Sequence, residues 1–132
     1  MRKYSRQREA LLTELRGRKD HPTAEELYFS LRAVIPNYSL GTVYRNLSDL
    51  STDGIIMKIS SGYGPERYDG NIQPHGHFTC TKCGRVYDLD GFYDSHVDTK
   101  EMIREIGNSA SGKDIASISE IRIMLYGNCV NC

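Results

Sequence analysis

The stretch His75-Gly76-His77-Phe78-Thr79-Cys80-Thr81-Lys82-Cys83-Gly84 decides how this chain folds, because it places two imidazoles and two thiols within nine residues. Thiols occur again only in Cys129-Val130-Asn131-Cys132. Two such Cys-x-x-Cys pairs supply four thiolates, which close one tetrahedral site and favour Zn2+. Because sulfur fills all four positions, we expect a structural role for this ion, which links the end of the last strand to the start of a sheet. The four expected ligands are Cys80, Cys83, Cys129 and Cys132.

The composition of the 132-residue chain is ordinary for a globular protein, with 39% hydrophobic and 26% charged residues. No apolar run approaches the ~20 residues of a membrane span, and the N-terminus leads into an amphipathic segment instead of an apolar signal sequence. We therefore expect a cytoplasmic protein without a membrane contact. In that compartment paired cysteines bind metal, whereas disulfides would require export.

The net charge of zero argues against a general binder of polyanions. Residues 1–67 are nevertheless net basic, and residues 68–132 are net acidic. This asymmetry suggests one half that meets an anion and another that holds cations.

Residues 1–70 have the pattern of three short helices followed by a β-hairpin. Ser5, Thr23 and Ser39 precede amphipathic segments as N-caps, and Glu26 completes a capping box with Thr23. The predicted elements are a helix over Arg6–Arg16, a helix from Thr23 that ends before Pro36 and buries Leu27, Leu31 and Val34, a helix from Leu40 to about Leu50, a strand over Ile55–Ser60 and a partner strand from Glu66. This order is typical of a winged helix-turn-helix.

In such a module the third helix enters the major groove of DNA. Its sequence places Tyr44, Arg45 and Asn46 mostly opposite the apolar side. We expect Arg45 to reach a guanine edge or a phosphate, Asn46 to pair with adenine, and Tyr44 to touch a thymine methyl or a phosphate. Lys58, in the hairpin, is the candidate for a backbone contact. The pattern alone is also that of a helical bundle which shows these side chains to solvent.

Residues 71–132 predict a small α/β unit. Two strands joined by the Cys-x-x-Cys-Gly knuckle precede a helix over Tyr93–Ile106 and a long strand over Ile115–Tyr126. Because small sheets with an unpaired edge commonly dimerise, a homodimer is expected. The predicted fold class is therefore α+β, with a winged helix-turn-helix at 1–70 and a small α/β dimerisation domain with a structural zinc site at 71–132.

His75 and His77 are two residues apart, so in an extended segment both point to one face, away from Cys80. Neighbouring carboxylates would shift the preference of such a site toward Fe2+ and Mn2+, and Asp69 and Asp88 are the candidates. The residues alone also allow both aspartates, and His21 beside its proline, to be exposed turn or strand-end residues.

Four segments resemble the ferric uptake regulator (Fur) family. They are His21-Pro22-Thr23-Ala24-Glu25-Glu26-Leu27-Tyr28, Ser39-Leu40-Gly41-Thr42-Val43-Tyr44-Arg45-Asn46-Leu47, Arg67-Tyr68-Asp69 and His75-x-His77-x-x-Cys80-x-x-Cys83-Gly84-Arg85-Val86. The resemblance implies a homodimeric, metal-dependent transcriptional repressor that binds operator DNA and is not an enzyme.

Within that family the pattern looks most like the peroxide-sensing (PerR) branch. The branch binds a regulatory Fe2+ or Mn2+ through three histidines and two aspartates, and the matching residues here are His21, Asp69, His75, His77 and Asp88. By resemblance, bound Fe2+ reacts with hydrogen peroxide and oxidises a ligating histidine, for which His21 and His75 match. The iron-responsive branch usually has Glu at the position of Asp88. A further family site uses a histidine where this chain has Ile121, which leaves one sensory metal and the zinc.

Three alternatives stay open. The first is an iron or other metal uptake repressor of the same family that does not sense peroxide. The second is a metal-dependent hydrolase, which would need an open coordination position and a general base. No further Glu or His is near the expected ligands to serve as this base, because His96 is isolated on a predicted helix. The third is a zinc-stapled interaction module without affinity for DNA. The family usually carries an earlier N-terminal helix with a basic residue that contacts DNA, for which Arg2, Lys3 and Arg6 are the candidate replacements.

Overall fold

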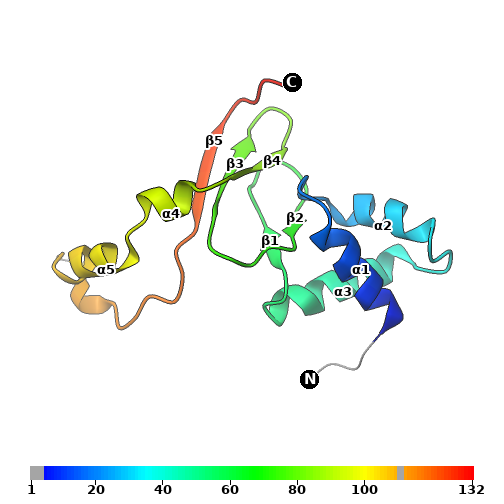
Figure 1. Cartoon of the computed structure of the whole chain (residues 1–132), viewed down its shortest axis with the longest axis horizontal. Coiled ribbons are helices and arrows are strands. Elements are labelled where there is room, and N and C mark those ends of the chain that lie inside the picture. The colour runs from blue at the N-terminus through cyan, green and yellow to red at the C-terminus, as the bar shows by residue number, and fades with distance from the viewer. Residues whose placement is uncertain (1–4, 110–111) are drawn as a thin grey trace.

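The first half of the chain forms three helices around one apolar core (Figure 1). The computed structural model describes residues 5–109 and 112–132, so Arg2 and Lys3 lie outside the described residues. The helices are α1 (Arg6–Arg16), α2 (Ala24–Arg32) and α3 (Leu40–Thr52). The core residues that they bury come from 11–68: Leu11, Leu12, Leu15, Ala24, Leu27, Leu31, Tyr38, Val43, Leu47, Leu50, Ile56 and Tyr68.

The three helices begin where the sequence predicts. The side chain of Ser5 accepts a hydrogen bond from the backbone of Arg8, and that of Ser39 accepts one from Thr42. At α2, Thr23 and Glu26 form the reciprocal capping box. Each cap satisfies N–H groups that a helix start otherwise leaves without a partner.

A two-stranded wing follows the helices. Strand β1 (Met57–Ile59) runs antiparallel to β2 (Arg67–Asp69), with Met57 opposite Asp69. Together with α1 to α3 this hairpin completes the predicted winged helix-turn-helix. Its last strand residue, Asp69, is buried at the border with the second half of the chain.

The second half is built on a three-stranded sheet in the order β4-β3-β5. Strand β3 (Gly76–Cys80) is central, antiparallel to β4 (Val86–Leu89) and parallel to β5 (Ile123–Gly127). The register sets His77 directly opposite Asp88. Figure 1 shows the sheet between the helical cluster and an arm made of α4 (Phe92–His96), α5 (Thr99–Gly107) and the short 3-10 helix η1 (Gly112–Asp114).

Two predicted elements of the second half were wrong in length. The helix expected over Tyr93–Ile106 is broken, because Val97 is extended and Asp98 starts a new helix as its N-cap. The strand expected over Ile115–Tyr126 is paired only from Ile123 onward. Ile123 lies opposite Gly76, the first residue of β3, so no ladder partner extends further back along the sheet.

Two side chains lie opposite to their predicted side. Val34 is 74% exposed, because α2 ends at Arg32 and the chain turns before Val34 can face the core. Asn46 is only 6% exposed, and its amide donates a hydrogen bond of 2.8 Å to the hydroxyl of Tyr38. The predicted adenine contact of Asn46 is therefore corrected to a role inside the helical core.

No helix among residues 5–109 and 112–132 is both long and apolar enough to span a membrane.

Replacing Asn46 tests this correction. Asn46→Ala leaves the buried hydroxyl of Tyr38 without its donor, so we expect the free energy of unfolding to fall by about 1–3 kcal/mol. Arg45→Ala, on the exposed side of the same helix, is expected to change it by no more than about 0.5 kcal/mol. Urea unfolding at one fixed protein concentration measures both. Equal stability of the two variants would contradict the buried role of Asn46.

Candidate metal centres

The four cysteines meet at one end of the sheet. Sulfur–sulfur distances are 3.5 Å from Cys80 to Cys132, 3.7 Å from Cys83 to Cys129 and 3.4 Å from Cys129 to Cys132. Four sulfurs bound to one Zn2+ lie ~3.8 Å apart, whereas a disulfide would bring two of them to ~2.05 Å. All four cysteines are free. The cluster therefore has the dimensions of a structural zinc site.

The surroundings of the thiols favour thiolate at one position and oppose it at another. Backbone N–H groups of Cys129 and Cys83 each point at the sulfur of Cys80 from 3.4 Å and lower the pKa of Cys80 to about 5. The neighbouring sulfur of Cys129 raises the pKa of Cys132 to about 12. Four thiols this close cannot all ionise unless a cation lies between them, which is the condition that Zn2+ fulfils.

A second cluster lies at the border between the helical half and the sheet. His21 comes from the loop before α2, Asp69 ends β2, His75 and His77 come from β3 and the turn before it, and Asp88 lies in β4. His21 is 2% exposed. The predicted five residues are thus brought together from four separate segments.

Two carboxylate oxygens in this cluster each face three imidazoles. Asp69 Oδ2 lies 3.3 Å from His21 Nε2, 2.9 Å from His75 Nε2 and 3.1 Å from His77 Nε2. Asp88 Oδ1 lies 2.8, 3.0 and 3.4 Å from the same three nitrogens. Donors ~2.1 Å from one ion are ~3.0 Å apart along the edges of an octahedron. The donor atoms of His21, Asp69, His77 and Asp88 all lie within 4.8 Å of one another, as the ligands of a single ion do, and His75 lies beside both carboxylates.

Backbone carbonyls fix the tautomers of two histidines. His21 Nδ1 lies 2.9 Å from the carbonyl oxygen of Val86, and His75 Nδ1 lies 2.6 Å from that of Gln73. A carbonyl oxygen only accepts, so both Nδ1 atoms carry the proton and each neutral ring turns its Nε2 lone pair toward the carboxylates. Lone pairs facing carboxylate oxygens at these distances repel unless a cation, either a metal or additional protons, lies among them.

The charge state of the cluster follows from the same contacts. In the imidazolium form of His21, Nε2 also carries a proton. Burial opposes this form, but hydrogen bonds from Nε2 to Asp69 and Asp88 outweigh it and raise the pKa of His21 above its ordinary value. Burial opposes ionisation of Asp69, yet hydrogen bonds from His21 and His77 and from the backbone of Asn71 hold its pKa well below the usual range. The site therefore keeps a carboxylate charge that attracts a cation. Nitrogen and carboxylate donors together suit Fe2+ or Mn2+.

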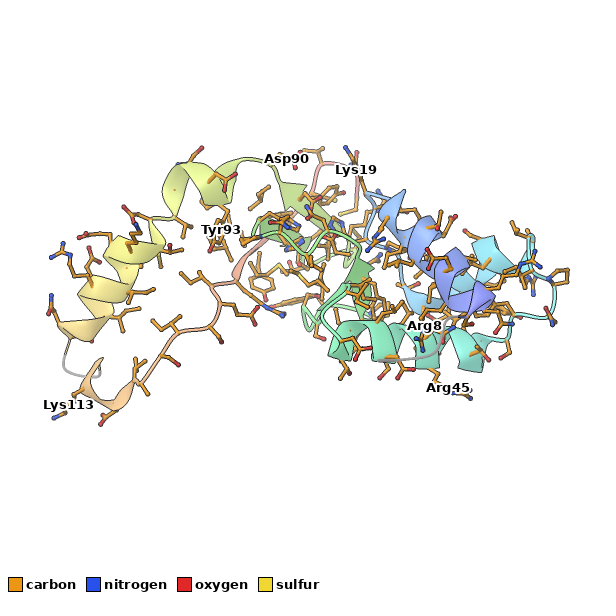
Figure 2. All side chains as sticks on the ribbon, turned by 60° about the horizontal axis from the view of Figure 1, so that its bottom comes forward. Arg8, Lys19, Arg45, Asp90, Tyr93 and Lys113 are labelled. Carbon is orange, nitrogen blue, oxygen red and sulfur yellow. The ribbon has the colours of Figure 1, made fainter. Side chains whose placement is uncertain are left out.

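A cavity of about 390 Å³ leads to this cluster from solvent. It reaches Asp69 and Asp88 between the end of α1 and β4. Lys19 and Asp90, which Figure 2 labels close together at one edge of the molecule, lie on its wall. Small solutes thus have a path to both carboxylates.

The predicted DNA contacts are divided by burial. Tyr44, Arg45 and Lys58 are exposed, whereas Asn46 is buried. Figure 2 shows Arg45 pointing away from the helical cluster. The hydroxyl of Tyr44 donates a hydrogen bond of 2.6 Å to Glu25 of α2, which orients its ring on the outer side of α3.

Reasoning from residue types alone missed how His21 enters the metal cluster. The residue is the only non-glycine among the described residues with a positive φ, at 51°, and its ring partner Val86 is 65 residues away. Only the resemblance to a family pointed to this histidine. The carbonyl groups of Val86 and Gln73 carry no signal in the sequence at all.

Comparison with known proteins agrees with this architecture. Residues 2–107 match the Ferric uptake regulator family. The peroxide-responsive repressor PerR of Staphylococcus epidermidis is 30% identical over 126 residues, which cover 96% of this chain and 78% of that protein. The structure of a Campylobacter jejuni peroxide stress regulator is 30% identical, covers 96% of this chain and 88% of its own, and has a TM-score of 0.72. The Helicobacter pylori ferric uptake regulator Fur, with three functional metal-binding sites, is 25% identical at 98% and 81% coverage and a TM-score of 0.73.

The fold and its neighbours are those of metal-responsive transcription regulators, which combine a winged helix with a small sheet domain. This chain belongs to the ferric uptake regulator family. The family resemblance seen in the sequence and the predicted fold class are confirmed.

The thiolate cluster leads to a prediction on metal content. Cys83→Ser removes one of the four sulfurs, so we expect bound zinc to fall from one ion per chain to well below that, because an incomplete tetrahedral site binds weakly. Lys82→Ser, which changes an exposed neighbour on the same knuckle, should keep one zinc. Elemental analysis of the purified proteins measures the stoichiometry. Full zinc retention by Cys83→Ser would exclude the four-thiolate site.

Proposed function

We propose that this protein is a metal-dependent transcriptional repressor that binds operator DNA as a homodimer and senses peroxide through one Fe2+ or Mn2+ site. The observation that carries the proposal is the cluster of three imidazoles and two carboxylates that spans both halves of the chain. Its proposed ligands are His21, Asp69, His75, His77 and Asp88. Free thiols, DNA as the partner and a regulatory role support a location in the cytoplasm.

The proposed domain division is a winged-helix domain at 1–70 and a metal-binding dimerisation domain at 71–132. The apolar core of residues 11–68 supports the first unit, and the separate three-stranded sheet supports the second. The proposed regulatory site lies where these units meet. His21 and Asp69 belong to the first, and the other three ligands belong to the second.

This position suggests how a metal controls DNA binding. An ion shared by ligands of both domains fixes their relative angle, so metal binding selects the conformer in which the winged helix fits DNA. Release of one ligand frees the angle again. Because His21 is the only proposed imidazole ligand from the first domain, its loss is expected to uncouple the domains most directly.

The donor set favours peroxide sensing over simple iron sensing. The chain carries Asp at position 88, as in the peroxide-sensing branch, and both the S. epidermidis repressor and the C. jejuni regulator are about 30% identical to it. Fe2+ bound at this site would mediate electron transfer to hydrogen peroxide, of which one oxygen atom would be added to an imidazole ring and the other would leave as water. His21 and His75 are the proposed targets of the oxidation. Since His21 is buried and bonded through both ring nitrogens, a change of its ring would disturb contacts with Val86 and Asp88 together.

The proposed DNA surface is the outer side of α3 and the wing. Tyr44, Arg45 and Lys58 are exposed there, and Lys58 lies 3.8 Å from Glu66 of the opposite wing segment. Arginine and lysine at such positions contact phosphates or base edges. Asn46 is not part of this surface.

A second copy of the chain is the proposed partner of the arm. Helix α5 buries none of its residues, although Met102, Ile103 and Ile106 give it an apolar side. Strand β5 is an edge strand, and no other strand of residues 5–109 and 112–132 pairs with its outer edge. A cavity of about 390 Å³ also separates α5 from residues 118–124, with an apolar lining that includes Ile103. These uncovered surfaces support a homodimer.

The decisive experiment compares DNA binding of the Fe2+ and Mn2+ forms before and after peroxide. We expect both forms to bind the operator, and peroxide to abolish binding by the Fe2+ form while sparing the Mn2+ form. Gel-shift or fluorescence anisotropy titration measures the affinity, and mass spectrometry locates added oxygen. If the Fe2+ form stays on DNA after peroxide, the protein is instead an iron or other metal uptake repressor of the same family.

Asp88→Glu is the matched variant for this experiment. The longer carboxylate keeps the charge but shifts its oxygen, so we expect metal-dependent DNA binding to persist with a weaker peroxide response. A peroxide response equal to that of the wild type would contradict the role proposed for Asp88.

The proposed dimer surface is tested by Ile103→Asp. A charge on the apolar side of α5 opposes burial, so this variant is expected to shift toward the monomer in size-exclusion chromatography with light scattering. Ser95→Asp, at an exposed position of α4, adds the same charge and should leave the dimer intact. Unchanged mass of the Ile103 variant would place the interface elsewhere.

A further inference from the structure

Arg67 joins three segments that lie far apart in the sequence. Its Nε donates a hydrogen bond of 3.0 Å to the carbonyl oxygen of Gly84, and an NH1 hydrogen bond of 3.2 Å goes to the carbonyl oxygen of His21. The same NH1 lies 3.4 Å from Glu26. With only 14% of its side chain exposed, Arg67 is held between the helical half and the sheet.

One of these partners, the carbonyl of His21, belongs to the backbone of a proposed metal ligand. His21 has a left-handed backbone with a φ of 51°, a conformation that residues other than glycine rarely adopt. Such a conformation persists only when its surroundings hold it. Arg67 binds the His21 carbonyl, and the neighbouring Tyr68 N–H donates 3.0 Å to the carbonyl oxygen of Pro22. Strand β2 therefore fixes the backbone that carries the His21 ring.

The other partner, Gly84, lies in the knuckle of the thiolate cluster. Gly84 directly follows Cys83 and has a φ of 77°. A Cβ at Gly84 would lie 2.5 Å from the carbonyl oxygen of Tyr63, so the knuckle packs against the turn of the wing with no space between them. Tyr63 also contacts Tyr126 of β5, with ring centroids 5.5 Å apart. The knuckle is thus docked on the winged helix as well as on its own sheet.

The two docking points are close along the chain. The carbonyl oxygen of Gly84 accepts a hydrogen bond from Arg67, and that of Val86, two residues later, accepts one from Nδ1 of His21. Any displacement of the knuckle would therefore move two acceptors that hold His21, one through Arg67 and one directly.

We propose that Arg67 is a positioning residue that couples the four-thiolate site to the regulatory metal site, by holding the backbone of His21 against the knuckle at Gly84. This inference rests on the proposed metal-dependent function and adds a thermodynamic link between its two metal sites. Because coupling between sites is reciprocal, a metal at the regulatory site also stabilises the knuckle and shields its thiols.

The test uses full-length, zinc-loaded protein and three variants. Arg67→Met removes the hydrogen bonds to both carbonyls and the contact with Glu26. Arg67→Lys keeps the charge but lacks the planar guanidinium that binds both carbonyls. Arg85→Met changes an exposed arginine on the same knuckle. The first measurement is the affinity for Mn2+ by calorimetric titration. We expect Arg67→Met to weaken it about tenfold or more, Arg67→Lys to weaken it less, and Arg85→Met to leave it unchanged.

The second measurement is the rate at which a thiol reagent, dithiobis(nitrobenzoate), reacts with the cysteines with and without Mn2+. Mn2+ is expected to slow this reaction severalfold in the wild type and in Arg85→Met, but not in Arg67→Met. A residue that merely stabilises the fold would lower the melting temperature and leave the protection by Mn2+ in place.

Wild-type affinity for Mn2+ in Arg67→Met, or protection by Mn2+ that persists in it, would overturn the coupling while leaving the proposed function intact. A wild-type protein that binds no Mn2+ would instead remove the proposed function and this inference together. Should Arg67→Met fail to fold, Arg67→Lys decides, because loss of its Mn2+ protection supports the proposal and full protection overturns it.

Discussion

Two carboxylate oxygens, from Asp69 and Asp88, each lie within 3.4 Å of three imidazole nitrogens, and the rest of the structure depends on how this crowding is resolved. Five donors at such distances are stable together only around positive charge. They come from the loop before α2, the end of β2, the segment that opens β3, and β4. These four segments must therefore bring their donor atoms to the same position, the centre of the cluster.

Close packing near the cluster keeps the segments in place. His77 and Asp88 are direct cross-strand neighbours, so the ladder itself sets their separation. The turn after Asp69 lies against the end of α1, where a Cβ at Gly70 would come within 3.0 Å of the Cα of Arg16. A side chain at this glycine would push the turn away from α1. The sheet register thus sets the separation of His77 and Asp88, and this contact keeps the turn after Asp69 against α1.

The sequence predicted the elements whose signals are local. The capping box of α2, the paired Cys-x-x-Cys segments and the His-x-His spacing each specify their geometry within a few residues. The side chain of Asn46 was misplaced although it follows Val43 by three residues and precedes Leu50 by four, which is the apolar side of α3. The prediction followed the polar character of asparagine instead of its position in the helical pattern.

Other features depend on contacts that no local pattern encodes. The start of β5 is set by where β3 begins, and the backbone of His21 by an arginine 46 residues away. The sequence does contain a signal for the break between α4 and α5, because Asp98 followed by Glu101 is typical of an N-cap. The apolar spacing across the break nevertheless favoured the prediction of one long helix. Periodicity alone does not separate one helix from two that follow each other.

The arm of the second half has a consequence for folding. A nine-residue helix is marginal in water by itself, and α5 has no buried residue within the described chain from which to gain stability. Whatever covers its apolar side must also supply the free energy that keeps it helical. In the proposed homodimer, folding of this arm is a bimolecular event, and the helical content of the protein depends on its concentration.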